Sequence, residues 1–149
     1  MTNNIILIVD DDALMRWSLA TNLEDEGFEP RAFGSGPEAL QYLADGGAAA
    51  AMLLDWQMPG MDGITVLRNL RRQEHMLPVI FLTGHSHPGR REVAMACGAA
   101  AFLDKTKSFS TVLHYLRLAV SETDDLEVTE PPAPPLPPMH AMGAPYAGK

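Results

Sequence analysis

Cysteine, basic side chains and long apolar runs are all scarce in this 149-residue sequence. Cys97 is the single cysteine, which excludes a disulfide framework and a multi-cysteine metal site. No run of about 18 apolar residues is present, and residues 1–4 lack the start of a secretory signal. Eleven Lys and Arg against 19 Asp and Glu give a net charge of −8, which argues against a nucleic-acid-binding surface. We therefore expect an acidic, cytoplasmic protein with neither a membrane nor a direct nucleic-acid partner.

The composition changes near residue 121. Residues 121–130 contain five acids and no base, and seven of the 12 prolines lie beyond residue 130. Proline has no backbone N–H, so such a segment favours extended polyproline structure and disorder over helix or sheet. We predict one domain at residues 1–121, followed at 122–149 by an acidic, then proline-rich, disordered tail or linker.

Short apolar runs alternate with helical patterns through the rest of the chain. We expect helix starts at Asp12, a capping residue, and at Ser35, which has Glu38 at capping-box spacing. Five strand-helix units predict an α/β fold, a doubly wound five-stranded parallel sheet with five helices on its two faces. The expected strands are 5–9, 28–33, 50–54, 78–82 and 101–103, and the later helices are 64–72, 90–97 and 108–120.

Polar side chains follow four of these strands, where functional groups gather in such sheets. They are Asp10, Asp11 and Asp12 after the first strand, Asp55 after the third, Thr83 after the fourth and Lys105 after the fifth. Clustered carboxylates repel one another unless a cation joins them, and Mg²⁺ prefers such oxygen ligands. With an ammonium and a hydroxyl beside them, these groups suit a transferring phosphoryl group.

Four segments around these residues resemble the receiver domain of two-component response regulators, across about residues 4–120. They read LIVDDD from Leu7, LDWQMPGMDG from Leu54, PVIFLTG from Pro78 and GAAAFLDK from Gly98. The resemblance implies the flavodoxin-like fold of chemotaxis receivers.

The resemblance also implies a role for each residue at the strand ends. Asp55 is expected to be the phosphoacceptor, taking its phosphoryl group from a sensor histidine kinase or a phosphotransfer protein. Lys105 is expected to pair with Asp55 and then with the phosphoryl group. The implied Mg²⁺ ligands are Asp10, Asp11, Asp55 and the backbone carbonyl of Gln57. The domain would catalyse only its own phosphorylation and dephosphorylation and would not otherwise be an enzyme.

A conformational switch is implied as well. Thr83 is expected to turn toward the phosphoryl group and Phe102 to follow it, which would remodel the surface of the fourth helix, fifth strand and fifth helix. A downstream partner, an output domain such as a transcriptional one, or a second phosphorylated copy would bind there. Gln57 and His85 lie where the family varies side chains that tune the phosphoryl lifetime.

One departure from the family lies directly after Lys105. The family usually has proline there, after a cis peptide bond, whereas this chain has Thr106. A cis bond before a non-proline residue costs about 2.5–4 kcal/mol, so we predict a trans bond and a rearranged loop, or a strained cis bond. Either outcome bears on the direction of Lys105, and Lys107 could partly replace it.

Two alternative functions remain open from the sequence. The first is a receiver-like binding module that works without phosphorylation, for which the missing proline is the only support. The second is a phosphatase of the haloacid dehalogenase type, because Asp10 to Asp12 contain a D-x-D motif after the first strand. In that case Asp10 would be the nucleophile, and the segment around Asp55 would have no explanation.

Overall fold

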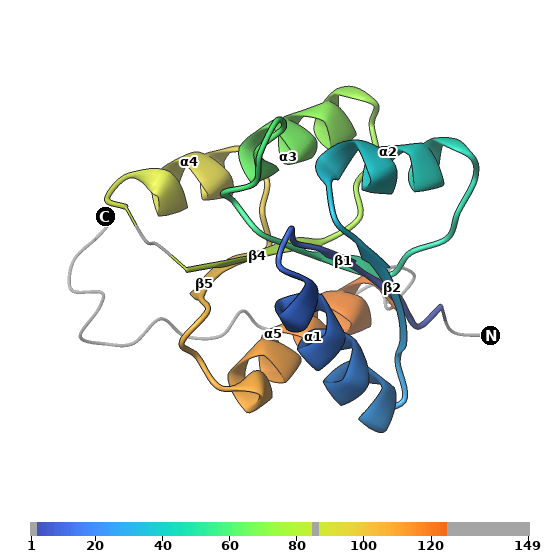
Figure 1. Ribbon diagram of the computed structural model, residues 1–149. Helices are drawn as coiled ribbons and strands as arrows, with labels where there is room; N and C mark the ends of the chain where they lie inside the picture. The colour runs from blue at the N-terminus through green and yellow to red at the C-terminus, as the bar shows by residue number, and fades with distance from the viewer. Residues whose placement is uncertain (1–2, 85–86, 125–149) are drawn as a thin grey trace.

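The computed structural model describes residues 3–84 and 87–124. In this part of the chain five strands alternate with five helices (Figure 1). The elements are β1 (Ile5–Val9), α1 (Ala13–Asp25), β2 (Glu29–Phe33), α2 (Gly36–Ala44), β3 (Ala51–Leu54), α3 (Gly63–Arg72), β4 (Val79–Thr83), α4 (Arg90–Ala96), β5 (Ala101–Asp104) and α5 (Phe109–Asp124).

The strands form one parallel sheet in the order β2-β1-β3-β4-β5. Helices α1 and α5 cover one face, and α2, α3 and α4 cover the other (Figure 1). The central strands β1, β3 and β4 are buried almost throughout, as expected for strands packed on both faces. The predicted doubly wound α/β architecture is therefore confirmed.

The two predicted helix caps behave differently. The Asp12 carboxylate accepts hydrogen bonds from the backbone N–H groups of Leu14 and Met15, so it caps α1 as predicted. Ser35 occupies the capping position of α2, but its side chain makes no capping hydrogen bond. The capping-box prediction is therefore wrong. Pro37 in the first turn has a backbone angle already suited to a helix start, which reduces the need for that bond.

Most element boundaries agree with the predictions to within one residue, and one helix end extends further. Strand β4 continues to Thr83, where the backbone carbonyl accepts a hydrogen bond of 2.8 Å from the Lys105 N–H. Helix α5 continues to Asp124, past the predicted end at residue 120. The remainder of the predicted tail, 125–149, lies outside the described residues. None of the helices in the described ranges has the length and apolar character needed to cross a membrane.

Candidate functional site

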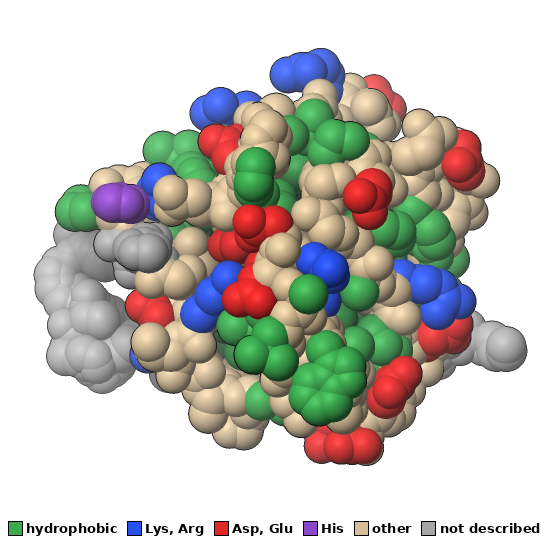
Figure 2. All heavy atoms as spheres, in the orientation of Figure 1, with side chains coloured by type: hydrophobic (Ala, Val, Ile, Leu, Met, Phe, Trp, Pro, Cys, Tyr) green, Lys and Arg blue, Asp and Glu red, His purple; other side chains and the backbone are tan. Residues whose placement is uncertain are grey.

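The register of the sheet brings the predicted polar residues to one edge. Val9 pairs with Leu54, Leu54 with Phe81, and Phe81 with Phe102. Asp10 and Asp55 therefore emerge at the same level, directly after Val9 and Leu54. Thr83 pairs with Asp104, the residue before Lys105, at the same edge of the sheet. In Figure 2 acidic side chains gather near the centre of the visible face, with basic side chains on either side.

Three carboxylates meet at this edge. Asp10 and Asp55 are buried, with 3% and 6% of their surfaces exposed, whereas Asp11 is exposed. One carboxylate oxygen from each of the three lies within 4.8 Å of the others. Such a set of hard oxygen donors, open to solvent on the Asp11 side, fits a Mg²⁺ ion.

Lys105 joins two of these carboxylates. Its Nζ lies 2.9 Å from Oδ2 of Asp10 and 3.2 Å from Oδ2 of Asp55, and its side chain is 19% exposed. The other Asp10 oxygen, Oδ1, accepts a hydrogen bond of 2.9 Å from the Asp12 N–H. Both oxygens of Asp10 are thus fixed, and a single ammonium group partly neutralises the buried acids.

This arrangement shifts two pKa values. Burial, and then the charge of Asp10, raises the pKa of Asp55 above its ordinary 3.8, while Lys105 and the backbone N–H of Gln57 oppose the rise. Burial also acts to lower the pKa of Lys105, but its hydrogen bonds and charge interactions with Asp10 and Asp55 outweigh burial and leave it raised. Lys105 therefore stays protonated at neutral pH.

Of the two predicted outcomes for the loop after Lys105, the structure has the trans peptide bond. No peptide bond in the described residues is cis, so the Lys105–Thr106 bond is trans. Asp104 holds a turn at this point. Its carboxylate accepts a hydrogen bond of 2.8 Å from the Thr106 N–H, and its backbone carbonyl accepts one of 3.0 Å from the Lys107 N–H. Lys105 nevertheless reaches Asp55. Lys107 does not replace it, because it is exposed and lines a pocket between α4 and α5.

The segment after Asp55 is closed by Gly63 at the start of α3. The Gly63 N–H donates 2.7 Å to the Trp56 carbonyl. A Cβ atom at Gly63 would lie 2.3 Å from the backbone oxygen of Asp55, well inside van der Waals contact. A residue with a side chain would therefore push the Asp55 backbone out of place.

The two residues predicted to switch lie on neighbouring strands. Thr83 is 1% exposed, and its buried Oγ1 has no hydrogen-bond partner among the described residues. Phe102 is 5% exposed, with its ring centroid 6.1 Å from that of Trp56 and 5.9 Å from that of Phe81. An unpaired buried hydroxyl costs about 1–3 kcal/mol of stability. The Thr83 hydroxyl would therefore be stabilised by a hydrogen-bond acceptor placed next to it. Gln57 is exposed next to Asp55, and His85 lies outside the described residues.

Comparison with known proteins shows the family of this chain. Residues 6–117 match the family model of the response regulator receiver domain. The chain belongs to that family. It is 34% identical over 121 residues to the DNA-binding transcriptional regulator NtrC of Escherichia coli (strain K12). The matched region is 81% of this chain and 26% of NtrC. It is 30% identical over 132 residues to the transcriptional regulatory protein FixJ of Bradyrhizobium diazoefficiens, which covers 89% of this chain and 64% of FixJ.

A solved structure agrees with these sequence relatives. The crystal structure of FixJ-N superposes with a TM-score of 0.75 at 30% identity, covering 81% of this chain and 96% of that one. The protein is thus a receiver domain, a signalling domain of two-component systems. The chain spans only part of the length of NtrC and of FixJ.

Two arginines of the receiver domain that the sequence analysis missed lie at the start of α4. The Arg90 guanidinium lies 5.0 Å from the centre of the Trp56 ring, and that of Arg91 lies 5.7 Å from the Phe102 ring. Arg91 also donates 3.0 Å to the Phe102 carbonyl. The two arginines therefore connect α4 to the residue after Asp55 and to the aromatic residue of the predicted switch. In the sequence, the only sign of these contacts is that the two arginines are adjacent.

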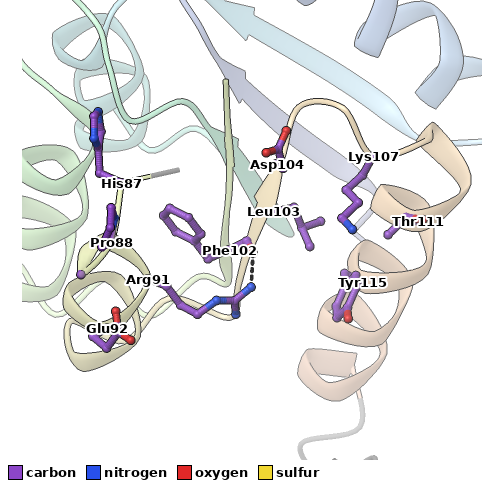
Figure 3. Close-up of a pocket in the computed structure, with 11 residues that line it drawn as sticks. His87, Pro88, Arg91, Glu92, Phe102, Leu103, Asp104, Lys107, Thr111 and Tyr115 are labelled. Atoms are coloured by element: carbon purple, nitrogen blue, oxygen red, sulfur yellow. Dashed lines mark hydrogen bonds between the residues drawn. The ribbon is translucent and has the colours of Figure 1, made fainter. Parts of the chain in front are cut away.

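A pocket of about 580 Å³ lies between α4, β5 and α5, on the face predicted to bind partners. Arg91 and Phe102 line it from α4 and β5, and Lys107 and Tyr115 from the opposite side (Figure 3). A shift of Phe102 would therefore change the wall of this pocket directly.

Proposed function

We propose that this receiver domain accepts a phosphoryl group on Asp55 from the phosphohistidine of a sensor kinase or phosphotransfer protein. The supporting observation is Lys105, whose ammonium bridges Asp55 and Asp10 in the carboxylate cluster. An ionised Oδ of Asp55 attacks phosphorus, the P–N bond to the donor imidazole breaks, and that nitrogen leaves with the bond's electron pair and takes up a proton. The reaction needs positioning and charge neutralisation rather than further covalent chemistry.

The protein ligands of the cation implied by the cluster would all be oxygen atoms, and its remaining positions would be open to water and a phosphoryl oxygen. Its ligands would be the carboxylates of Asp10, Asp11 and Asp55 together with the carbonyl of Gln57. When bound, Mg²⁺ supplies positive charge that offsets the carboxylates and a phosphoryl oxygen. Asp10 is already fixed for this role through both of its oxygens.

After transfer, the protein groups around Asp55 hold the new phosphoryl oxygens. Lys105 exchanges its contact with the free carboxylate for one with the phosphoryl group. Thr83 supplies the second contact, since its buried hydroxyl gains a strong acceptor where it had no partner. Gly84 follows it, and a Cβ atom there would lie 3.7 Å from Cδ of Lys105, so this glycine is next to the Lys105 side chain.

The movement of Thr83 passes to the α4–β5–α5 face through aromatic rings. Phe102 packs against Trp56 and Phe81, so a rearrangement of the neighbouring strand end would reach it through these rings. Arg90 and Arg91 then transmit the change to α4, because they contact two of these rings. The altered face would bind an output domain, a partner protein or a second copy. Because NtrC and FixJ are named as transcriptional regulators, transcription is the output we propose.

A protein donor is favoured by the surface next to the site. Leu14 and Trp17 on α1 are 72% and 66% exposed, and α1 begins directly beyond the acidic loop. Apolar side chains so placed offer a docking surface from which a donor histidine reaches Asp55. Gln57 and His85 would tune how long the phosphoryl group persists, and the domain would catalyse only its own phosphorylation and dephosphorylation.

Intact mass after incubation with acetyl phosphate and Mg²⁺ tests this proposal. We expect the wild type and the exposed control Asp45→Asn to gain one phosphoryl group, and Asp55→Asn to gain none. If the wild type neither gains mass nor binds beryllofluoride, the protein is a binding module that works without phosphorylation. Steady turnover of a phosphate ester that Asp10→Asn abolishes and Asp55→Asn does not would favour the phosphatase.

A further inference from the structure

Arg16, in the second turn of α1, contacts the loop that carries the acidic residues. Its Nη1 donates a hydrogen bond of 2.8 Å to the backbone carbonyl of Asp10. On the other side of the same residue, the Asp10 N–H donates 3.2 Å to the Phe33 carbonyl at the end of β2. The main chain of Asp10 is therefore held from α1 and from β2 together.

A glycine provides the space for this arginine. A Cβ atom at Gly34, directly after β2, would lie 3.2 Å from Nη1 of Arg16 and 3.6 Å from its Cζ. The guanidinium thus packs against the bare backbone of Gly34, partly buried between α1 and the end of β2. Its position is set by packing as well as by the hydrogen bond.

The carbonyl that Arg16 holds belongs to the peptide unit that joins Asp10 to Asp11. This unit is planar, so fixing its oxygen fixes the direction in which the chain enters Asp11. Asp11 is the exposed member of the carboxylate cluster, whereas Asp10 is already fixed by its side-chain contacts. Arg16 thus fixes the peptide that leads to Asp11, and the Asp11 carboxylate is the least restrained of the three.

We propose that Arg16 is a positioning residue for the divalent cation: it holds the Asp10–Asp11 peptide so that the Asp11 carboxylate faces those of Asp10 and Asp55. This inference rests on the metal dependence in the proposed function. Residues that orient metal ligands typically change metal affinity about 10- to 100-fold when they are removed. Because the bond that orients Asp11 is a single one, we expect a value at the lower end of that range.

Substitution of Arg16 by methionine separates positioning from charge. Loss of a positive charge beside three carboxylates would by itself tighten the binding of Mg²⁺. Loss of the peptide orientation weakens it. The two effects have opposite signs, so the direction of the change identifies the one that dominates.

The experiment is an NMR titration of the metal-stripped 149-residue chain with Mg²⁺ alone. We expect Arg16→Met to bind about 10-fold more weakly than the wild type, Arg16→Lys to recover part of the loss through its single donor, and the exposed control Arg31→Met to be unchanged. In acetyl phosphate labelling, the Mg²⁺ concentration for half-maximal rate should rise in Arg16→Met, while the rate at saturation is kept.

The outcomes separate this inference from the proposed function. If the wild type binds no Mg²⁺, the proposed metal dependence is wrong. If the wild type binds it and Arg16→Met binds equally well or more tightly, the positioning role alone is refuted. Should Arg16→Met fail to fold, Gly34→Ala displaces the guanidinium without changing α1, and it should weaken Mg²⁺ binding by a smaller factor. Unchanged binding in Gly34→Ala would then refute the role.

Discussion

Replacing Lys105 by methionine tests the electrostatics of the site most directly. The variant keeps the length of the side chain but leaves Asp10 and Asp55 without the ammonium that lies 2.9 Å and 3.2 Å from them. Removing one partner of a fully buried ion pair costs about 3–5 kcal/mol. Because the Lys105 side chain is 19% exposed, we expect a loss of about 2 kcal/mol in the free energy of unfolding at neutral pH without divalent cations.

Urea unfolding measures this loss. With a slope of about 1.5 kcal/mol per molar urea, a loss of about 2 kcal/mol lowers the midpoint by about 1.3 M. Lys107→Met is the matched control, since Lys107 is exposed in the same loop, and its midpoint should stay close to that of the wild type.

The cause of this loss of stability can be tested by measuring how the difference in the free energy of unfolding between Lys105→Met and wild type depends on pH. Burial and Asp10 raise the pKa of Asp55, and Lys105 opposes them, so the pKa rises further when Lys105 is lost. A carboxyl whose pKa is raised by folding destabilises the fold above that pKa, and the penalty disappears as the pH falls toward its ordinary value of 3.8. The gap in the free energy of unfolding between Lys105→Met and wild type should therefore narrow on acidification and on addition of Mg²⁺. A gap that is absent at neutral pH, or that widens in acid, would refute the reasoning.

Three further predictions concern Asp55, the proposed phosphoacceptor, and its surroundings. Gly63→Ala should lose about 2–3 kcal/mol of stability in urea unfolding, because its Cβ would lie 2.3 Å from the Asp55 carbonyl, and an unchanged midpoint would contradict so close an approach. Asp55→Asn should raise the urea midpoint in metal-free buffer at neutral pH, since burial raises the pKa of the ionisable group that it removes, and this gain should shrink in acid. Arg90→Gln should change the fluorescence emission of Trp56, recorded in a Trp17→Phe background, because its guanidinium lies 5.0 Å from that ring, and an identical spectrum would exclude the contact in solution.

Much of the fold could be read from local pattern. Buried parallel strands are continuous apolar runs, and five of them alternating with helical periods leave few topologies. The positions of Asp10, Asp55 and Thr83 followed from the rule that polar groups gather at the carboxyl ends of such strands. The capping box at Ser35 failed, because a residue at the right spacing need not turn its side chain toward the helix end.

The direction of Lys105 could not be settled from the sequence. The family resemblance made proline the expected next residue, and Thr106 left the path of the loop open. In the fold a turn held by Asp104 replaces the proline, and Lys105 still meets Asp55, which is 50 residues away in sequence.

The sequence by itself determined the strand-helix order, the family and the polar residues at the strand ends, because these depend on local periodicity and on motifs of adjacent residues. Only the tertiary structure showed that Lys105, whose pairing with Asp55 the resemblance implied, also contacts Asp10, and where three arginines are placed around the site. Arg16 behind the Asp10 carbonyl, Arg90 and Arg91 over two aromatic rings, and Lys105 between two carboxylates are contacts between separate elements. Their partners are set by sheet register and helix packing, and neither is encoded in any short stretch of the chain.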